Sequence, residues 1–167
     1  MKKGAGIAAG LLVVVSLGAA CSKSSPTTAP APTSYAPVTT SAAAPTEAPG
    51  ASVQATIKDF TIVLSTNTVP SGTVNFDVTN DGPATHEFVV LRTGTSADGF
   101  KIGSFEGESG RINETGKDVT NVGETGDMKP GATKTLSIED MSPGHYAIVC
   151  NLPGHYGNGM HEDFTVT

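Results

Sequence analysis

From residue 51 onward, short runs in which apolar and polar side chains alternate constrain the fold more than any other feature of the chain. An alternation with a period of two places apolar side chains on one face of a β-strand. The strand-like runs lie at residues 53–57, 60–64, 74–78, 87–91, 133–138, 146–150 and 164–166. Residues typical of turns separate them at 69–72, 80–83 and 142–144. We therefore predict an all-β fold, an antiparallel Greek-key β-sandwich of about seven or eight strands.

Two interruptions of this pattern require interpretation. The alternation that ends at Ile57 changes phase at Lys58 and Asp59 before it resumes at Phe60, which predicts a bulge or a bend within or between two strands. Residues 93–130 are rich in Gly, Thr, Asn and acidic residues, and their apolar residues are thinly spread. We predict an irregular excursion there, with room for a short helix. Both a functional loop and a surface insertion remain open.

The first twenty residues have the layout of an export signal. Lys2 and Lys3 precede an apolar run at residues 7–17, and small residues lead to Cys21. This order resembles a bacterial lipoprotein signal, which implies a lipid on Cys21 and anchoring to the outer face of the cell membrane. An ordinary secretory signal, cleaved just before Cys21, is the alternative and implies a periplasmic or secreted protein.

Residues 21–50 form a linker of Ser, Thr, Pro and Ala, in which only Lys23 and Glu47 are charged. Such a composition cannot bury a core, so we predict an extended tether between the anchor and a single domain at residues 51–167. The chain has a formal net charge of -6. This acidic balance argues against nucleic acid as a partner.

The chain ends in a loop that concentrates soft metal ligands. Cys150 continues the alternation of the predicted strand at 146–150 and is expected to point inward at its end. Cys150, His155 and Met160 follow one another with the spacing C-x4-H-x4-M. Two imidazoles, a thiolate and a weak thioether form the ligand set of blue copper sites. His86, which stands where a loop enters a predicted strand, is the candidate for the second imidazole. The other cysteine, Cys21, has the separate role described above, so we predict no disulfide.

Residues 78–90 and 143–160 resemble the corresponding segments of cupredoxins, the small blue copper proteins. The ligand loop is most similar to the sulfocyanin, auracyanin and rusticyanin type. The resemblance implies one type 1 copper ion, held by His86, Cys150 and His155 as equatorial ligands and by Met160 as the axial ligand.

The resemblance also implies a route for the electron and a surface for docking. His155 is the expected exit, and an apolar rim surrounds it. This expected docking patch consists of His155, Pro83, Ala84, Leu152 and Pro153.

One position departs from the cupredoxin pattern. Many members of the family have Asn after the first histidine ligand, where its side chain ties the two ligand-bearing loops together, but this chain has Glu87. We expect the Glu87 backbone N–H to reach the Cys150 sulfur, and whether the side chain also ties the loops is left open. The remaining histidines, His145 and His161, are interpreted as a surface residue and a residue at the rim of the site.

Two functions share this set of ligands. The first is a monomeric carrier of single electrons between extracytoplasmic redox proteins, and the second is a copper-binding protein for delivery or sequestration. A copper enzyme needs further metal sites built from many additional histidines, and the chain has only 4. We therefore predict no enzymatic activity.

Overall fold

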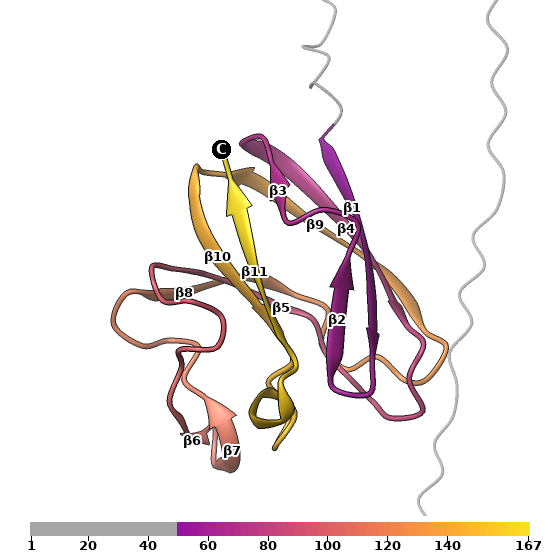
Figure 1. Ribbon diagram of the computed structural model, residues 1–167, viewed down its shortest axis with the longest axis vertical. Coiled ribbons are helices and arrows are strands. Elements are labelled where there is room, and N and C mark those ends of the chain that lie inside the picture. Colours follow the sequence, from indigo (N-terminus) through magenta and orange to yellow (C-terminus); the bar gives the residue numbers. More distant parts are fainter. Residues whose placement is uncertain (1–49) are drawn as a thin grey trace, which may run out of the picture. The chain divides into compact units, whose positions relative to one another are not determined.

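The computed structural model describes residues 50–167 of the chain (Figure 1). The predicted signal peptide, Cys21 and almost all of the predicted linker lie outside this range. No helix among residues 50–167 is long and apolar enough to span a membrane.

The described residues form eleven strands and one short 3-10 helix. In chain order they are β1 (Ala51–Lys58), β2 (Thr61–Leu64), β3 (Thr68–Val69), β4 (Gly72–Asn80), β5 (Val89–Thr93), β6 (Ile102–Phe105), β7 (Glu108–Ile112), β8 (Val119–Glu124), β9 (Thr133–Met141), β10 (Gly144–Val149), η1 (Tyr156–Asn158) and β11 (His161–Val166).

Two main sheets pack face to face and confirm the predicted all-β sandwich. The first has the strand order β2-β1-β4-β9, and the second has the order β3-β11-β10-β5-β8. The alternating apolar side chains of both sheets meet in one core. At its centre, the ring of Phe76 from the first sheet lies 5.3 Å from the ring of Phe164 and 5.4 Å from that of Phe88.

The sheets are mixed, although most strand pairs are antiparallel as predicted. β1 pairs with β4 and β3 pairs with β11 in parallel. Alternation specifies which face of a strand is buried but not the direction of its neighbour. The direction follows from the connections. After β2 the chain crosses to β3 in the second sheet, and it then returns to the first sheet as β4, which runs in the same direction as β1.

The phase change after Ile57 is a bend between two strands, as predicted. Lys58 pairs with Thr61, so Asp59 and Phe60 form a two-residue hairpin turn between β1 and β2. Phe60 was predicted to begin the second strand, but it lies in the turn and is 39% exposed.

The prediction of an irregular excursion with a short helix at residues 93–130 is wrong. The segment contains β6 and β7, which form a hairpin, and β8, which pairs with β5 at the edge of the second sheet. All residues of β6 and β8 are exposed or half-buried. Strands without a fully buried face show little alternation of apolar residues, so the sequence pattern did not reveal them.

The same segment covers the outer face of the second sheet. Ala97 and Ile112 pack with Val89, Leu91 and Val149 in a second apolar cluster. β5 and β10 are therefore buried on both faces, and this arrangement fixes the strand end from which Cys150 projects.

Candidate metal centre

Four separate elements bring the predicted ligands to one end of the sandwich. Cys150 directly follows β10, and Met160 directly precedes β11. His155 directly precedes the helix η1, as its N-cap residue. His86 lies before β5, in a bridge with Met128. Tyr146, Ile148 and Cys150 are all buried in the sandwich core, which confirms the predicted inward phase of β10.

The three equatorial candidates face one another. The Nδ1 atoms of His86 and His155 are 3.1 Å apart, and the His155 Nδ1 atom is 3.3 Å from the Cys150 Sγ atom. All three candidate ligand atoms lie within 4.8 Å of one another. Imidazole nitrogen and thiolate sulfur lie about 2.0–2.3 Å from a bound transition metal, so atoms that share one ion are separated by about 3–4 Å. The geometry of these residues therefore fits a single metal ion.

The environment of the cluster suits copper. His86, Cys150 and Met160 are almost completely buried, with exposures of 1%, 0% and 0%. Two imidazoles, a thiolate and a nearby thioether are acceptable ligands for both oxidation states of copper. Met160 belongs to the same buried cluster as Cys150, and the Cys150 N–H donates a hydrogen bond of 3.0 Å to the Met160 carbonyl.

Burial sets the protonation states of these groups. It lowers the pKa of His155, and burial together with the nearby charge of His155 lowers the pKa of His86. Both imidazoles are therefore neutral at neutral pH, which is the form that binds a metal. Burial raises the pKa of Cys150 to about 11, so its thiol is protonated in the metal-free protein. A bound metal ion displaces that proton and stabilises the thiolate.

The ligand loop is held in shape by its own backbone. The His155 N–H donates to the Leu152 carbonyl at 2.9 Å, and the Met160 N–H donates to the His155 carbonyl at 3.3 Å. Gly154 and Gly159 adopt left-handed backbone conformations, with φ values of 83° and 98°. Glycine tolerates these values without strain, and they fold the loop tightly enough for Met160 to return to the core.

Asn80 organises the loop that carries His86, and it was not among the predicted site residues. This fully buried side chain donates hydrogen bonds of 2.8 Å to the carbonyls of Ala84 and Met128, and it accepts one of 2.9 Å from the Gly82 N–H. The His86 backbone forms two hydrogen bonds with Met128. An Asn directly before the Asp-Gly-Pro turn was the only signal in the sequence.

Glu87 connects the two ligand-bearing loops through both its backbone and its side chain. Its N–H lies 3.4 Å from the Cys150 Sγ atom, as expected. Its carboxylate also ties the loops together, which the sequence left open, since its Oε1 atom accepts a 2.9 Å hydrogen bond from the Asn151 N–H. Burial raises the pKa of Glu87 to about 7, an effect that the Arg111 guanidinium 3.7 Å away opposes.

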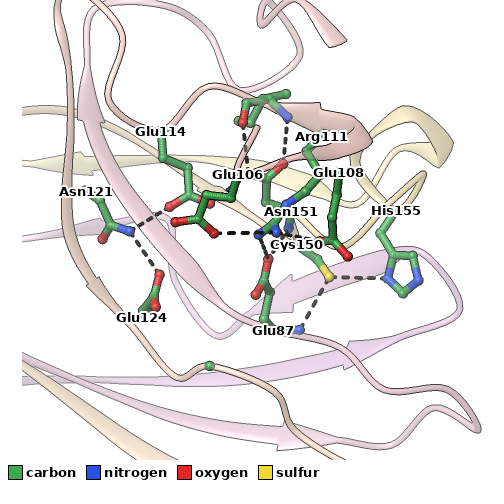
Figure 2. Close-up of polar contacts among 12 residues, drawn as sticks. Glu87, Glu106, Glu108, Arg111, Glu114, Asn121, Glu124, Cys150, Asn151 and His155 are labelled. Carbon is green, nitrogen blue, oxygen red and sulfur yellow. Dashed lines mark hydrogen bonds and ion pairs between the residues drawn. The ribbon is translucent and has the colours of Figure 1, made fainter. Parts of the chain in front are cut away.

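Asn151 joins the ligand loop to the β6–β7 hairpin (Figure 2). Its buried side chain accepts a 2.7 Å hydrogen bond from the Ile112 N–H and donates to the Ile112 carbonyl at 3.0 Å and to Glu114 at 2.7 Å. The Gly154 N–H also donates to the Gly110 carbonyl at 2.9 Å. This clamp was not predicted, because residues 93–130 were expected to be irregular.

The other two histidines, which were expected at the surface and at the rim of the site, are both half-buried. His145 is half-buried, and its two ring nitrogens contact the Thr93 carbonyl at 3.0 Å and Asp163 at 2.8 Å. The ring of His161 packs against Tyr156 with 5.0 Å between the centroids. Neither belongs to the cluster of candidate ligands among residues 50–167.

The residues of the expected docking patch are accessible to different degrees. Pro83, Ala84 and Pro153 are exposed, whereas Leu152 and His155 are half-buried. Phe60 was not predicted to belong to this patch, but its ring lies 5.1 Å from that of His155.

Comparisons with known proteins identify the family. The family model described as the sulfocyanin (SoxE) domain matches residues 55–167. Reduced auracyanin from Roseiflexus castenholzii has a similar fold, with a TM-score of 0.51 and 23% identity over 71% of this chain and 99% of that chain. Auracyanin B matches with a TM-score of 0.50 and 18% identity over 72% of this chain and 91% of that chain. No match was found among curated proteins. The chain belongs to the sulfocyanin family of cupredoxins, blue copper proteins that bind one type 1 copper ion.

Proposed function

We propose that residues 51–167 carry single electrons between extracytoplasmic redox partners, with His86, Cys150 and His155 as equatorial copper ligands and Met160 as the axial ligand. The observation that carries this proposal is the buried cluster in which the two Nδ1 atoms and the Sγ atom face one another. When bound, copper supplies a one-electron couple between Cu(I) and Cu(II).

The protein contributes a cage that resists rearrangement. The Glu87 carboxylate holds the backbone that follows Cys150, and Asn80 holds the loop that carries His86. Because these supports are buried and hydrogen-bonded, the ligands keep their positions when the charge of the site changes. A small rearrangement favours rapid electron transfer.

The burial of the ligands favours electron transfer over copper delivery. A delivery protein passes its ion to a partner whose ligands must reach the metal. Here His86, Cys150 and Met160 are inaccessible to a partner, and only His155 is half-exposed. An electron can leave through the His155 ring, whereas the ion cannot leave without opening the loop.

We further propose that His155 and the patch of Pro83, Ala84, Leu152 and Pro153 meet the redox partner. Apolar side chains at such a surface exclude water and shorten the distance between the redox centres. The acidic balance of the chain favours a partner with basic residues around its own apolar contact.

A simple experiment tests the proposed function. The protein is loaded with Cu(II), and its visible and EPR spectra are recorded during a redox titration. An intense blue colour from the Cu–thiolate bond, which disappears reversibly on one-electron reduction, is the expected result. A colourless protein with one bound Cu(II) would exclude the proposed ligand set.

Substitution of the axial candidate should tune the site without destroying it. We expect Met160→Leu to keep the blue colour and to raise the reduction potential, because a thioether donor is replaced by an apolar group that disfavours the more highly charged ion. Spectroelectrochemical titration measures the shift. Met141→Leu is the matched control, since Met141 is also buried but lies at the distant end of β9. Equal potentials in both variants would contradict an axial role for Met160.

We propose that a lipid on Cys21 anchors the domain and that the linker lets it reach its partners. In polyproline-like form, at about 3.1 Å per residue, residues 22–50 reach on the order of 90 Å. We expect Cys21→Ser to release the protein from the membrane fraction of cells. Mass analysis of the mature N-terminus is the direct measurement. An unmodified Cys21 in the membrane-bound protein would contradict the anchor.

A further inference from the structure

The turn between β1 and β2 holds a bulky residue in a conformation that suits glycine. Asp59 and Phe60 have φ values of 44° and 62°, both in the left-handed region. Lys58 and Thr61 pair on either side, and the Thr61 hydroxyl donates a 2.7 Å hydrogen bond to the Lys58 carbonyl. Two-residue turns of this kind favour Asn or Asp followed by Gly. Asp59 follows this preference, but an aromatic residue at the second position is strained.

The strained turn places the Phe60 ring against both histidine candidates. The ring centroid lies 5.1 Å from that of His155 and 6.5 Å from that of His86, with interplanar angles of 88° and 86°. This edge-to-face geometry is the favourable one for aromatic rings. The β1–β2 turn and η1 lie at the same end of the sandwich (Figure 1).

Packing into the core does not explain this residue. Phe60 is one of the few large apolar side chains of the described domain that are exposed, at 39%. A glycine in its place would relieve the backbone strain and would remove an apolar surface from water. A glycine at position 60 would, however, lack the ring that contacts the two imidazoles.

We propose that Phe60 is a positioning residue that holds the His155 ring in its binding orientation and shields the two imidazoles from water. Its role at the copper ion rests on the proposed function, whereas its effect on the His155 ring does not need the metal. The strain in the turn is retained because it directs the ring toward the site.

The metal-free protein provides the first test. We expect Phe60→Gly to fold, because glycine is the preferred residue at this position. The NMR signals of the His155 ring should shift and broaden, because the ring loses its neighbour and gains rotational freedom. Asp59→Gly is the matched control: it relieves strain in the same turn, keeps the phenyl ring and should leave the His155 signals in place. Unchanged His155 signals in Phe60→Gly would overturn the proposal.

The copper-loaded protein provides the second test. We expect Phe60→Gly to lower the reduction potential, because water that reaches the site stabilises the more highly charged Cu(II) state. Val63→Ala is the control, since Val63 is an exposed apolar residue of the same hairpin. An unchanged potential in Phe60→Gly would overturn the shielding role. A parent protein that shows no blue colour would refute the proposed function, and the test on the metal-free protein would still decide whether Phe60 positions His155.

Discussion

The substitution Cys150→Ser is expected to abolish the blue colour of the copper-loaded protein while leaving the fold intact. The colour arises from the bond between Cu(II) and a thiolate, and a serine hydroxyl does not replace this ligand. The Glu87 N–H that lies 3.4 Å from the Cys150 sulfur can donate to a hydroxyl oxygen as well. The cost to folding should therefore stay at about 1–2 kcal/mol. Visible absorption, EPR and the copper-to-protein ratio measure the effect.

His161→Ala is the matched control for this prediction. His161 is a potential metal ligand next to Met160, but it packs against Tyr156 and lies outside the cluster of candidate ligands. We expect this variant to keep the colour and the copper content of the parent protein. A coloured Cys150→Ser protein, or a colourless His161→Ala protein, would show that the ligands have been assigned incorrectly.

The second large effect is expected from Asn151→Ala, which removes the clamp between the ligand loop and the β6–β7 hairpin. The substitution leaves the N–H and carbonyl of Ile112 and one oxygen of Glu114 without their partner in a buried region. Each orphaned buried group costs about 1–3 kcal/mol, so we expect the free energy of unfolding to fall by about 3 kcal/mol or more. For a domain of this size, the melting temperature should drop by about 10–20 °C.

Urea or thermal unfolding of the metal-free protein measures this loss. Asn158→Ala is the matched control on the same loop, because Asn158 is exposed and its side chain makes one hydrogen bond of 2.8 Å to the Gly154 carbonyl. Its loss should cost less than about 1 kcal/mol. Similar losses for the two variants would mean that the clamp does not stabilise the ligand loop. Copper titrations should also show weaker binding by Asn151→Ala, because the loop is less well ordered.

The predictions for the sandwich succeeded where strands bury one face completely. In β4, the side chains of Val74, Phe76 and Val78 alternate and are all buried between the two sheets. Such strands can be recognised in the sequence, because every second residue must be apolar. The alternation does not indicate whether neighbouring strands run parallel or antiparallel, so the parallel pairing of β1 with β4 was not predicted.

The predictions failed for the segment of 93–130, where burial is partial and polar contacts define the structure. The β6–β7 hairpin turns at Glu106 and Gly107, both with positive φ values, and its strands are rich in glycine and polar residues. The hairpin supports the metal centre through individual contacts, such as the hydrogen bond from the Ile112 N–H to the Asn151 side chain. A contact between two polar groups far apart in the chain produces no periodic pattern and no characteristic spacing in the sequence.

By itself, the sequence determined the all-β class, the inward phase of Cys150 and a candidate ligand set, because alternation and the C-x4-H-x4-M spacing are local properties. Only the tertiary structure decided which groups surround that set. His86 and His155, 69 positions apart, come within 3.1 Å of each other. Glu87 ties the two loops, and Phe60 packs against His155 from a strained turn. The burial and the partner of a single side chain depend on the surfaces that folding brings together, and the neighbouring residues in the chain do not specify them.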